Sequence, residues 1–135
     1  MIIIPRDILG DMAKHAEEHA PVEACGLLVG VGLEVTKSYR LTNLDASPEH
    51  FSLDPKEQFA VIKEIRPQGW DVIGVYHSHP ATPARMSEED LRLALAPEMR
   101  YVIVSLVNRE SPQVKSFTVW QGQPVEEPVL TEEQQ

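Results

Sequence analysis

The residues most suited to chemistry lie in one short stretch, in which two histidines are followed by a serine and an aspartate. His77 and His79 follow the apolar segment 72–76. On a strand they would share one face, with Cα atoms about 6.5–7 Å apart. Two imidazoles at that spacing can bind one ion, and Asp90 on the next element can supply a third ligand. Three protein ligands leave a fourth position for water, which is typical of a catalytic zinc site. The stretch therefore predicts a zinc hydrolase with one Zn²⁺ per chain.

Ser87 and Asp90 also have a simpler interpretation. A serine three residues before an aspartate, ahead of an apolar run, is a helix-capping pattern. A lone histidine, likewise, is more often a surface or core residue than a ligand. The spacing of the whole set favours the metal site, and Ser87 can cap a helix and take part in catalysis at the same time.

A hydrolase of this kind needs a carboxylate that moves a proton from water to the leaving amine. Most acidic residues lie on polar helix faces or near the acidic C-terminus. Glu23 differs, because it directly precedes the apolar run 24–31. A carboxyl group at the edge of a buried strand would have a raised pKa, as a proton shuttle requires. A glutamate at a strand edge is also often simply solvated, so the pattern alone leaves its role open.

Cys25 is the single cysteine, which excludes a disulfide framework and a cysteine-rich zinc site. It could be a fourth ligand or a redox residue, since it would share a strand face with Glu23. A fourth protein ligand would displace the water, so we favour a small buried apolar residue. A single cysteine also argues against a zinc deaminase, whose site requires a P-C-x-x-C pair.

Length and charge limit the remaining classes of function. The 135 residues predict one domain, and the net charge of −9 argues against a nucleic-acid or anionic-membrane partner. The N-terminus does not resemble a signal peptide, and no apolar run approaches the ~20 residues of a membrane span. We therefore expect a cytoplasmic protein. The sequence leaves the oligomeric state open, a homodimer included.

The elements that must position these residues alternate between helices and strands. The pattern predicts a helix over 5–20, strands over 24–31 and 34–44, a helix over 55–66, a strand over 71–77, a short helix over 87–95, and strands over 100–107 and 114–120. This order indicates an α/β (α+β) fold in which helices flank a mixed sheet. Residues 1–122 would form the domain and residues 123–135 an acidic, flexible tail.

Five other residues are predicted to have structural roles only. The histidines are expected to be exposed and the tryptophans to pack against the core: His15, His19, His50, Trp70 and Trp120.

The complete pattern, Glu23 followed by H-S-H-P, seven residues between His79 and Ser87, and then Asp90, resembles the JAMM motif of the MPN+ (Mov34/MPN/PAD-1) metallopeptidases. Segment 21–30 also resembles the first strand of that family. The similarity continues in the following segment, at Asn43, Pro48 and Phe51, and extends to about Trp120.

This resemblance implies a cytidine-deaminase-like fold with a curved mixed sheet, and it implies a role for each motif residue. His77, His79 and Asp90 would be zinc ligands, Glu23 the general acid/base, and Ser87 a stabiliser of the oxyanion. The chain departs from many relatives at residue 86, where methionine replaces a proline. That change puts the shape of the loop in question rather than the ligand set.

The short chain resembles the compact prokaryotic type of this family. By that resemblance, its partner would be a ubiquitin-like or sulfur-carrier protein with a C-terminal Gly-Gly tail, and the enzyme would cleave the bond after the diglycine. An extended tail can add to a sheet edge, and glycines pass through a narrow groove because they lack Cβ. Segments 45–51 and 81–86 are the candidate groove. The competing hypothesis is a non-catalytic MPN scaffold, a class that typically lacks the ligands found here.

Overall fold

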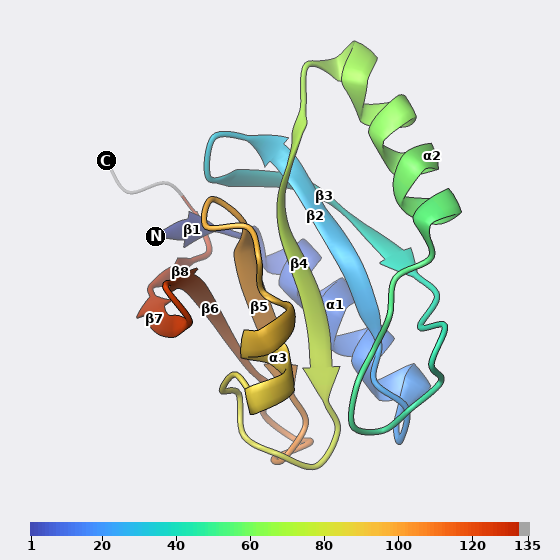
Figure 1. Ribbon diagram of the computed structural model, residues 1–135, viewed down its shortest axis with the longest axis vertical. Coiled ribbons are helices and arrows are strands. Elements are labelled where there is room, and N and C mark those ends of the chain that lie inside the picture. Colours follow the sequence, from blue (N-terminus) through green and yellow to red (C-terminus); the bar gives the residue numbers. More distant parts are fainter. Residues whose placement is uncertain (133–135) are drawn as a thin grey trace.

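In the computed structural model, which describes residues 1–132, the strands form one curved sheet with helices on both faces (Figure 1). The elements in chain order are β1 (Ile2–Ile3), α1 (Arg6–His19), β2 (Cys25–Val31), β3 (Glu34–Leu41), α2 (Pro55–Ile65), the 3-10 turn η1 (Arg66–Gln68), β4 (Asp71–His79), α3 (Glu88–Leu93), β5 (Arg100–Ser105), β6 (Gln113–Trp120), β7 (Gln123–Glu127) and β8 (Val129–Leu130). Within these residues, no helix is both long and apolar enough to cross a bilayer.

The sheet is mixed, with the strand order β7-β6-β5-β4-β2-β3-β1-β8. The central pair β4–β5 is parallel, whereas β2 pairs antiparallel with both β3 and β4, and β6 pairs antiparallel with both β5 and β7. The prediction of a mixed sheet flanked by helices is confirmed. Because β4 lies between β2 and β5, its C-terminal end is held by ladder hydrogen bonds on both sides.

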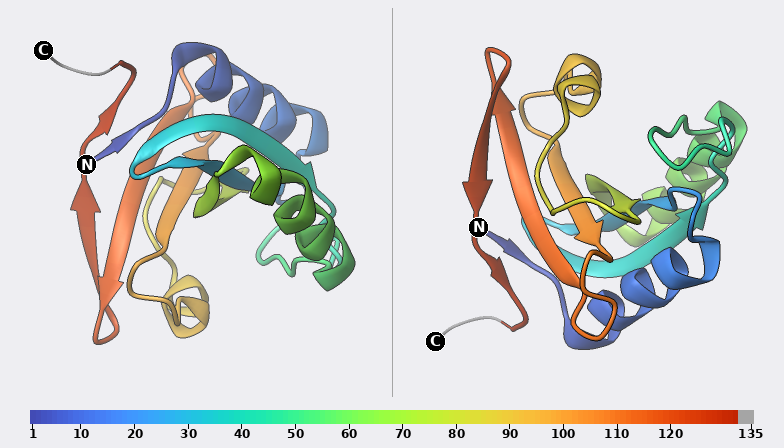
Figure 2. Two further views of the ribbon diagram at one scale, coloured as in Figure 1. Left: turned by 90° about the horizontal axis from the view of Figure 1, so that it is seen from above. Right: turned by 90° about the horizontal axis from the view of Figure 1, so that it is seen from below.

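The two faces of the sheet bury different helices (Figure 2). Helix α1 covers one face, and it presents Ile8, Met12 and Ala16 at four-residue spacing to a core that includes Tyr76 of β4. Helices α2 and α3 lie over the other face, to which Val75 of β4 contributes. Since side chains alternate along a strand, His77 and His79 face the side of α2 and α3.

The prediction that His15 is exposed is wrong. It lies three residues after Met12, on the buried stripe of α1, and is only 1% exposed. Its Nδ1 is 2.7 Å from the hydroxyl oxygen of Tyr76, so the buried imidazole has a polar partner. The Tyr76 ring lies across Gly26 of β2, where an added Cβ would come within 2.2 Å of that ring. A glycine is therefore required at position 26.

Residues 123–130, which were predicted to belong to a flexible tail, include the two short strands β7 and β8. Gln121 and Gly122 both have positive φ and form the two-residue turn of a hairpin that pairs Trp120 with Gln123. β7 and β8 stand at opposite ends of the strand order, where β7 pairs with β6 and β8 pairs with β1. Edge strands tolerate proline, so Pro124 within β7 and Pro128 between the two strands do not prevent them from forming. Residues 133–135 of the predicted tail lie outside the described part.

Trp120 does not pack against the core as predicted. It is the last residue of β6, next to the hairpin turn, and it is 64% exposed. Trp70 is partly buried against the core beneath α2, as predicted.

Candidate active site

The C-terminal end of β4 brings His77 and His79 together beside α3. Ser78 between them points to the opposite face, where its hydroxyl oxygen accepts a hydrogen bond of 2.8 Å from the Ala24 N–H. In the ladder, His77 lies opposite Cys25 of β2 and Ile103 of β5. The backbone of both histidines is thus fixed by neighbouring strands, and only their rings reach the site.

Three donor atoms from His77, His79 and Asp90 form a nearly equilateral triangle. The two Nε2 atoms are 3.2 Å apart, and each is 3.2 Å from Oδ2 of Asp90. Bonds of about 2.0–2.1 Å in a tetrahedral zinc site require ligand atoms roughly 3.3 Å apart. The three donors therefore have the separation of one face of a zinc tetrahedron, and this group could hold a metal ion.

A second layer of contacts fixes the two imidazole rings. His79 Nδ1 donates a hydrogen bond of 2.9 Å to the carbonyl oxygen of Pro83, which leaves the Nε2 lone pair directed toward the triangle. The ring of Phe51 stacks on the His77 ring, with centroids 4.6 Å apart and planes 23° from parallel. The orientation of each ring is thus supported by a residue that is not itself a donor: Pro83 for His79 and Phe51 for His77.

Ser87 caps α3, and the cap also orients Asp90. The Ser87 side chain accepts a hydrogen bond of 3.0 Å from the Asp90 N–H, while Asp90 Oδ2 accepts one of 2.9 Å from the Ser87 N–H. That same Oδ2 belongs to the donor triangle. The Ser87 hydroxyl acts as an acceptor in the cap, so its own O–H remains available to donate at the exposed edge of the site.

Electrostatics at the triangle favours one carboxylate and at least one neutral imidazole. Burial lowers the pKa of His77, as a metal ligand requires. Burial alone would raise the pKa of Asp90, but hydrogen bonds from His77 and His79 hold it well below its ordinary value. Burial opposes charge on His79 too, yet its contacts with Asp90 and Pro83 raise its pKa overall.

Glu23 is not a solvated strand-edge residue. It is 2% exposed, and its Oε1 is buried with no hydrogen-bond partner among residues 1–132. Burial raises the pKa of Glu23 to about 8; the charge of His79 opposes this shift, and the charges of Asp90 and Glu89 add to it. Two members of the triangle, His79 and Asp90, are thus among the charges that affect the Glu23 pKa. An unpaired buried oxygen is costly unless another molecule uses it.

Cys25 is a buried core residue, as predicted. Its side chain is in the apolar cluster beneath α2, with Sγ 3.9 Å from the Leu41 carbonyl oxygen. Burial raises the pKa of Cys25 to about 12, so a thiolate is disfavoured. It is not among the residues that make the donor triangle.

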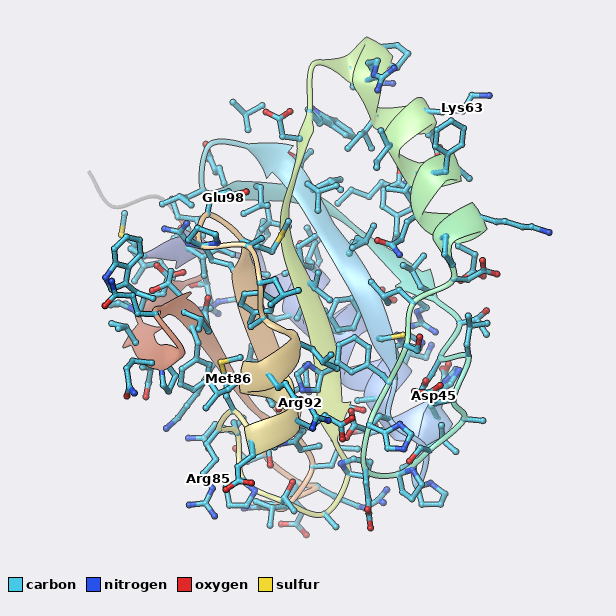
Figure 3. The ribbon with its side chains drawn as sticks, in the orientation of Figure 1. Asp45, Lys63, Arg85, Met86, Arg92 and Glu98 are labelled. Atoms are coloured by element: carbon cyan, nitrogen blue, oxygen red, sulfur yellow. The ribbon has the colours of Figure 1, made fainter. Side chains whose placement is uncertain are left out.

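An apolar cavity opens beside the triangle, between α3 and the loop after β3. Figure 3 shows Arg92 of α3 and Asp45 of that loop on opposite sides of the end of β4. The lining residues other than His77 and Asp90 are His50, Phe51, Met86, Glu89, Leu93 and Tyr101. Segments 45–51 and 81–86 were predicted to form the groove and supply three of them. Glu89, Leu93 and Tyr101 were missed, because none of them has a spacing or motif that separates it from ordinary surface or core residues.

Comparison with known proteins gives consistent matches along most of the chain. The model of the family described as prokaryotic homologs of the JAB domain matches residues 5–120. The CysO-cysteine peptidase of Mycobacterium tuberculosis is 34% identical over 136 residues, covering 99% of this chain and 93% of the peptidase. The desampylase of Haloferax volcanii is 34% identical over 106 residues, which cover 73% of this chain and 76% of the desampylase. The solution structure of a protein from Desulfitobacterium hafniense is 45% identical in sequence and has a TM-score of 0.90. The match covers 99% of this chain and 94% of that protein.

Proposed function

The chain belongs to the prokaryotic homologues of the JAB domain, and from this premise we propose that it is a zinc-dependent peptidase or isopeptidase acting after the C-terminal Gly-Gly of a ubiquitin-like protein. The resemblance seen in the sequence is confirmed at the level of the family. Relatives that span most of this chain are named as a peptidase and a desampylase, both hydrolases. The observation that carries the proposal is the donor triangle of His77, His79 and Asp90, together with the buried carboxyl group of Glu23, whose Oε1 has no hydrogen-bond partner among the described residues.

His77, His79 and Asp90 are the residues that would hold the metal. Two nitrogens and one oxygen are a donor set that zinc binds well, and their 3.2 Å separations fit a tetrahedral site. When bound, zinc supplies Lewis acidity for a scissile carbonyl and for water. The protein's part is to bury these donors and to hold them at the correct spacing.

Glu23 is the proposed proton shuttle. It would accept a proton as water attacks the carbonyl carbon and deliver that proton to the nitrogen as the C–N bond breaks. A pKa of about 8 is near neutrality, so the protonated and ionised forms are both accessible. The unpaired Oε1 gives that proton a place to bind without breaking an existing hydrogen bond.

Ser87 is the proposed donor to the oxyanion. Its hydroxyl lies at the first turn of α3, where the free N–H groups of the helix also favour negative charge. The cap uses a lone pair of Oγ and leaves the O–H to interact with substrate. The residue therefore combines the two roles that its sequence context suggested.

The proposed path of the carrier tail runs between α3 and the loop after β3, over the cavity of about 40 Å³ that lies there. Its walls are largely apolar, and the loop side is formed by Phe51. Two glycines next to the scissile bond would let the backbone come close to the donor triangle, because they add no side-chain bulk. The peptide nitrogen of the group beyond the diglycine would then be the leaving amine.

The test is cleavage of a purified carrier protein that extends past its diglycine. Zinc content is measured first, and the product masses then show which bond is cut. We expect cleavage after the second glycine by the zinc-loaded protein and none by the EDTA-treated protein. Full zinc loading without cleavage, with no difference between the wild type and Glu23→Gln, would favour the non-catalytic scaffold.

A further inference from the structure

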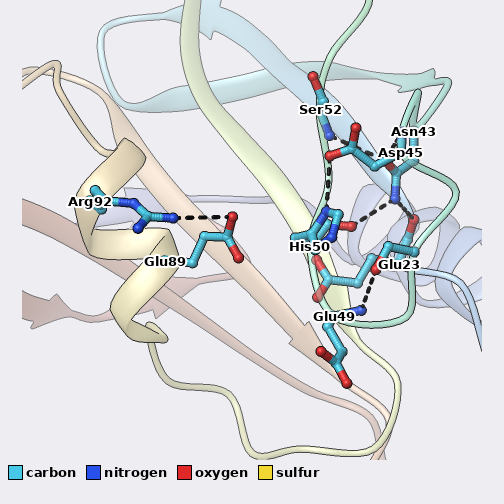
Figure 4. A network of polar contacts seen from close by, with 9 residues as sticks. Glu23, Asn43, Asp45, Glu49, His50, Ser52, Glu89 and Arg92 are labelled. Carbon is cyan, nitrogen blue, oxygen red and sulfur yellow. Dashed lines mark hydrogen bonds and ion pairs between the residues drawn. The ribbon is translucent and has the colours of Figure 1, made fainter.

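Asn43 connects the backbone of Glu23 to the loop that forms one wall of the site. It follows β3 and is 8% exposed. Its Nδ2 donates to the carbonyl oxygens of Glu23 at 3.0 Å and of His50 at 3.1 Å. Its Oδ1 accepts from the N–H groups of Asp45 at 3.0 Å and of Ser52 at 3.1 Å. These contacts use both donors and both lone pairs of the amide (Figure 4).

The partners leave no choice of side chain at this position. Two carbonyl oxygens lie on one side of the amide and two N–H groups on the other, so the reversed amide would face four mismatched groups. Aspartate could keep the two bonds to Oδ1 but has no N–H for Glu23 and His50. An asparagine is the shortest side chain that satisfies all four backbone groups.

The same loop contacts Glu23 and His77 at two further points. The Glu23 N–H donates a hydrogen bond of 2.9 Å to the Ser47 carbonyl oxygen, so both backbone groups of Glu23 are bound by this segment. Phe51, next to the Ser52 amide that Asn43 binds, stacks on the ring of His77. The segment from Asn43 to Ser52 thus links the proposed shuttle to a residue of the donor triangle.

We propose that Asn43 is a positioning residue for the reaction proposed above: it fixes the Glu23 backbone and the loop over His77 relative to each other. Asn43 itself does not touch the reacting atoms. Its effect on rate passes through the placement of the Glu23 carboxyl group. The expected effect of Asn43 on the rate rests on the proposed function. Its effect on the structure of the loop rests on the hydrogen bonds alone.

Asn43→Ala should lower kcat by about 10- to 100-fold while zinc content stays at the wild-type level, because misplacing a catalytic group by ~1 Å costs about that much. Thr42→Val is the matched control. It removes the neighbouring Thr42 hydroxyl, which binds Glu57 on α2 and does not touch Glu23 or His50. We expect the control to keep kcat within about threefold of the wild type.

A double-mutant cycle separates positioning from a general structural role. If Asn43 acts through Glu23, then adding Asn43→Ala to the Glu23→Gln protein should cost at most a few-fold in single-turnover rate. A full 10- to 100-fold loss in that background, or a kcat for Asn43→Ala equal to that of Thr42→Val, would overturn the proposal.

Amide hydrogen exchange tests the same linkage without substrate. Asn43→Ala should lose protection at the Asp45 and Ser52 amides, whereas Asn43→Asp should keep that protection and still lose kcat. The aspartate variant also serves if the alanine variant does not fold. If the wild type cleaves no carrier, the proposed function fails and the exchange data alone decide whether Asn43 positions the loop. Protection that is lost in Asn43→Ala but kept in Thr42→Val would support the positioning role. Unchanged protection in Asn43→Ala would refute it.

Discussion

Replacing Glu23 with glutamine should make the metal-free protein more stable at neutral pH. The folded pKa of about 8 exceeds the ordinary value of 4.5 because the carboxyl group is buried. Between these two values, the folded protein holds a proton that the unfolded chain has released. The stability contribution of this group is therefore fully present below pH 4.5 and is lost as the pH rises toward 8.

The size of this effect follows from the pKa difference. Stability falls by about 1.4 kcal/mol per pH unit in this window, which gives roughly 3 kcal/mol between pH 4.5 and pH 7. Glutamine does not titrate, so the free energy of unfolding of Glu23→Gln, minus that of the wild type, should rise by about this amount over the window.

Urea unfolding of EDTA-treated protein at several pH values measures the difference. Glu49→Gln is the matched control, because it makes the same substitution at an exposed glutamate on the neighbouring loop. A difference between Glu23→Gln and wild type that stays constant from pH 4.5 to pH 7 would refute the conclusion that burial raises the pKa of Glu23.

Further predictions concern the metal ligands and the cap. His77→Ala should abolish both zinc binding and cleavage, since two donors remain of three; metal analysis after dialysis checks this, and stoichiometric zinc in the variant would contradict the ligand set. Zinc should raise the Tm of the wild type and leave that of His77→Ala unchanged, as calorimetry with and without zinc would show. Ser87→Ala should cost about 1 kcal/mol of stability through loss of the cap, and Ser87→Gly only a few tenths. Both Ser87 variants should lose kcat with zinc still bound; full activity in Ser87→Gly would exclude the hydroxyl as oxyanion donor.

The order of the main elements from α1 to β6, and the candidate metal ligands, could be predicted because they follow from local patterns; β1 and β8 were not predicted. The spacing of His77 and His79 places both on one face of β4, and Asp90 follows in the next element of the chain, α3. The same holds for the Ser87 cap, which needs only three following residues.

Features that depend on partners distant in sequence could not be predicted. His15 is buried against Tyr76, whose ring lies over Gly26. Gly26 and Tyr76 are neighbours only because of the register in which β2 pairs with β4. The burial of Glu23 and the four bonds of Asn43 depend likewise on how the loop after β3 folds back. β7 was missed because its prolines and acidic residues outweighed the turn at Gly122, and its pairing depends on β6.

The measurement that tests the central claim most directly compares wild type and Glu23→Gln, each loaded with one zinc, on a carrier protein extended past its diglycine. Mass spectrometry reports the cleaved bond and a time course reports the rate. We expect wild type to cleave after the second glycine, and Glu23→Gln to retain its zinc and be slower by roughly 10²-fold or more. Equal rates for the two zinc-loaded proteins would contradict the assignment of Glu23, and no cleavage by either would contradict the proposed activity.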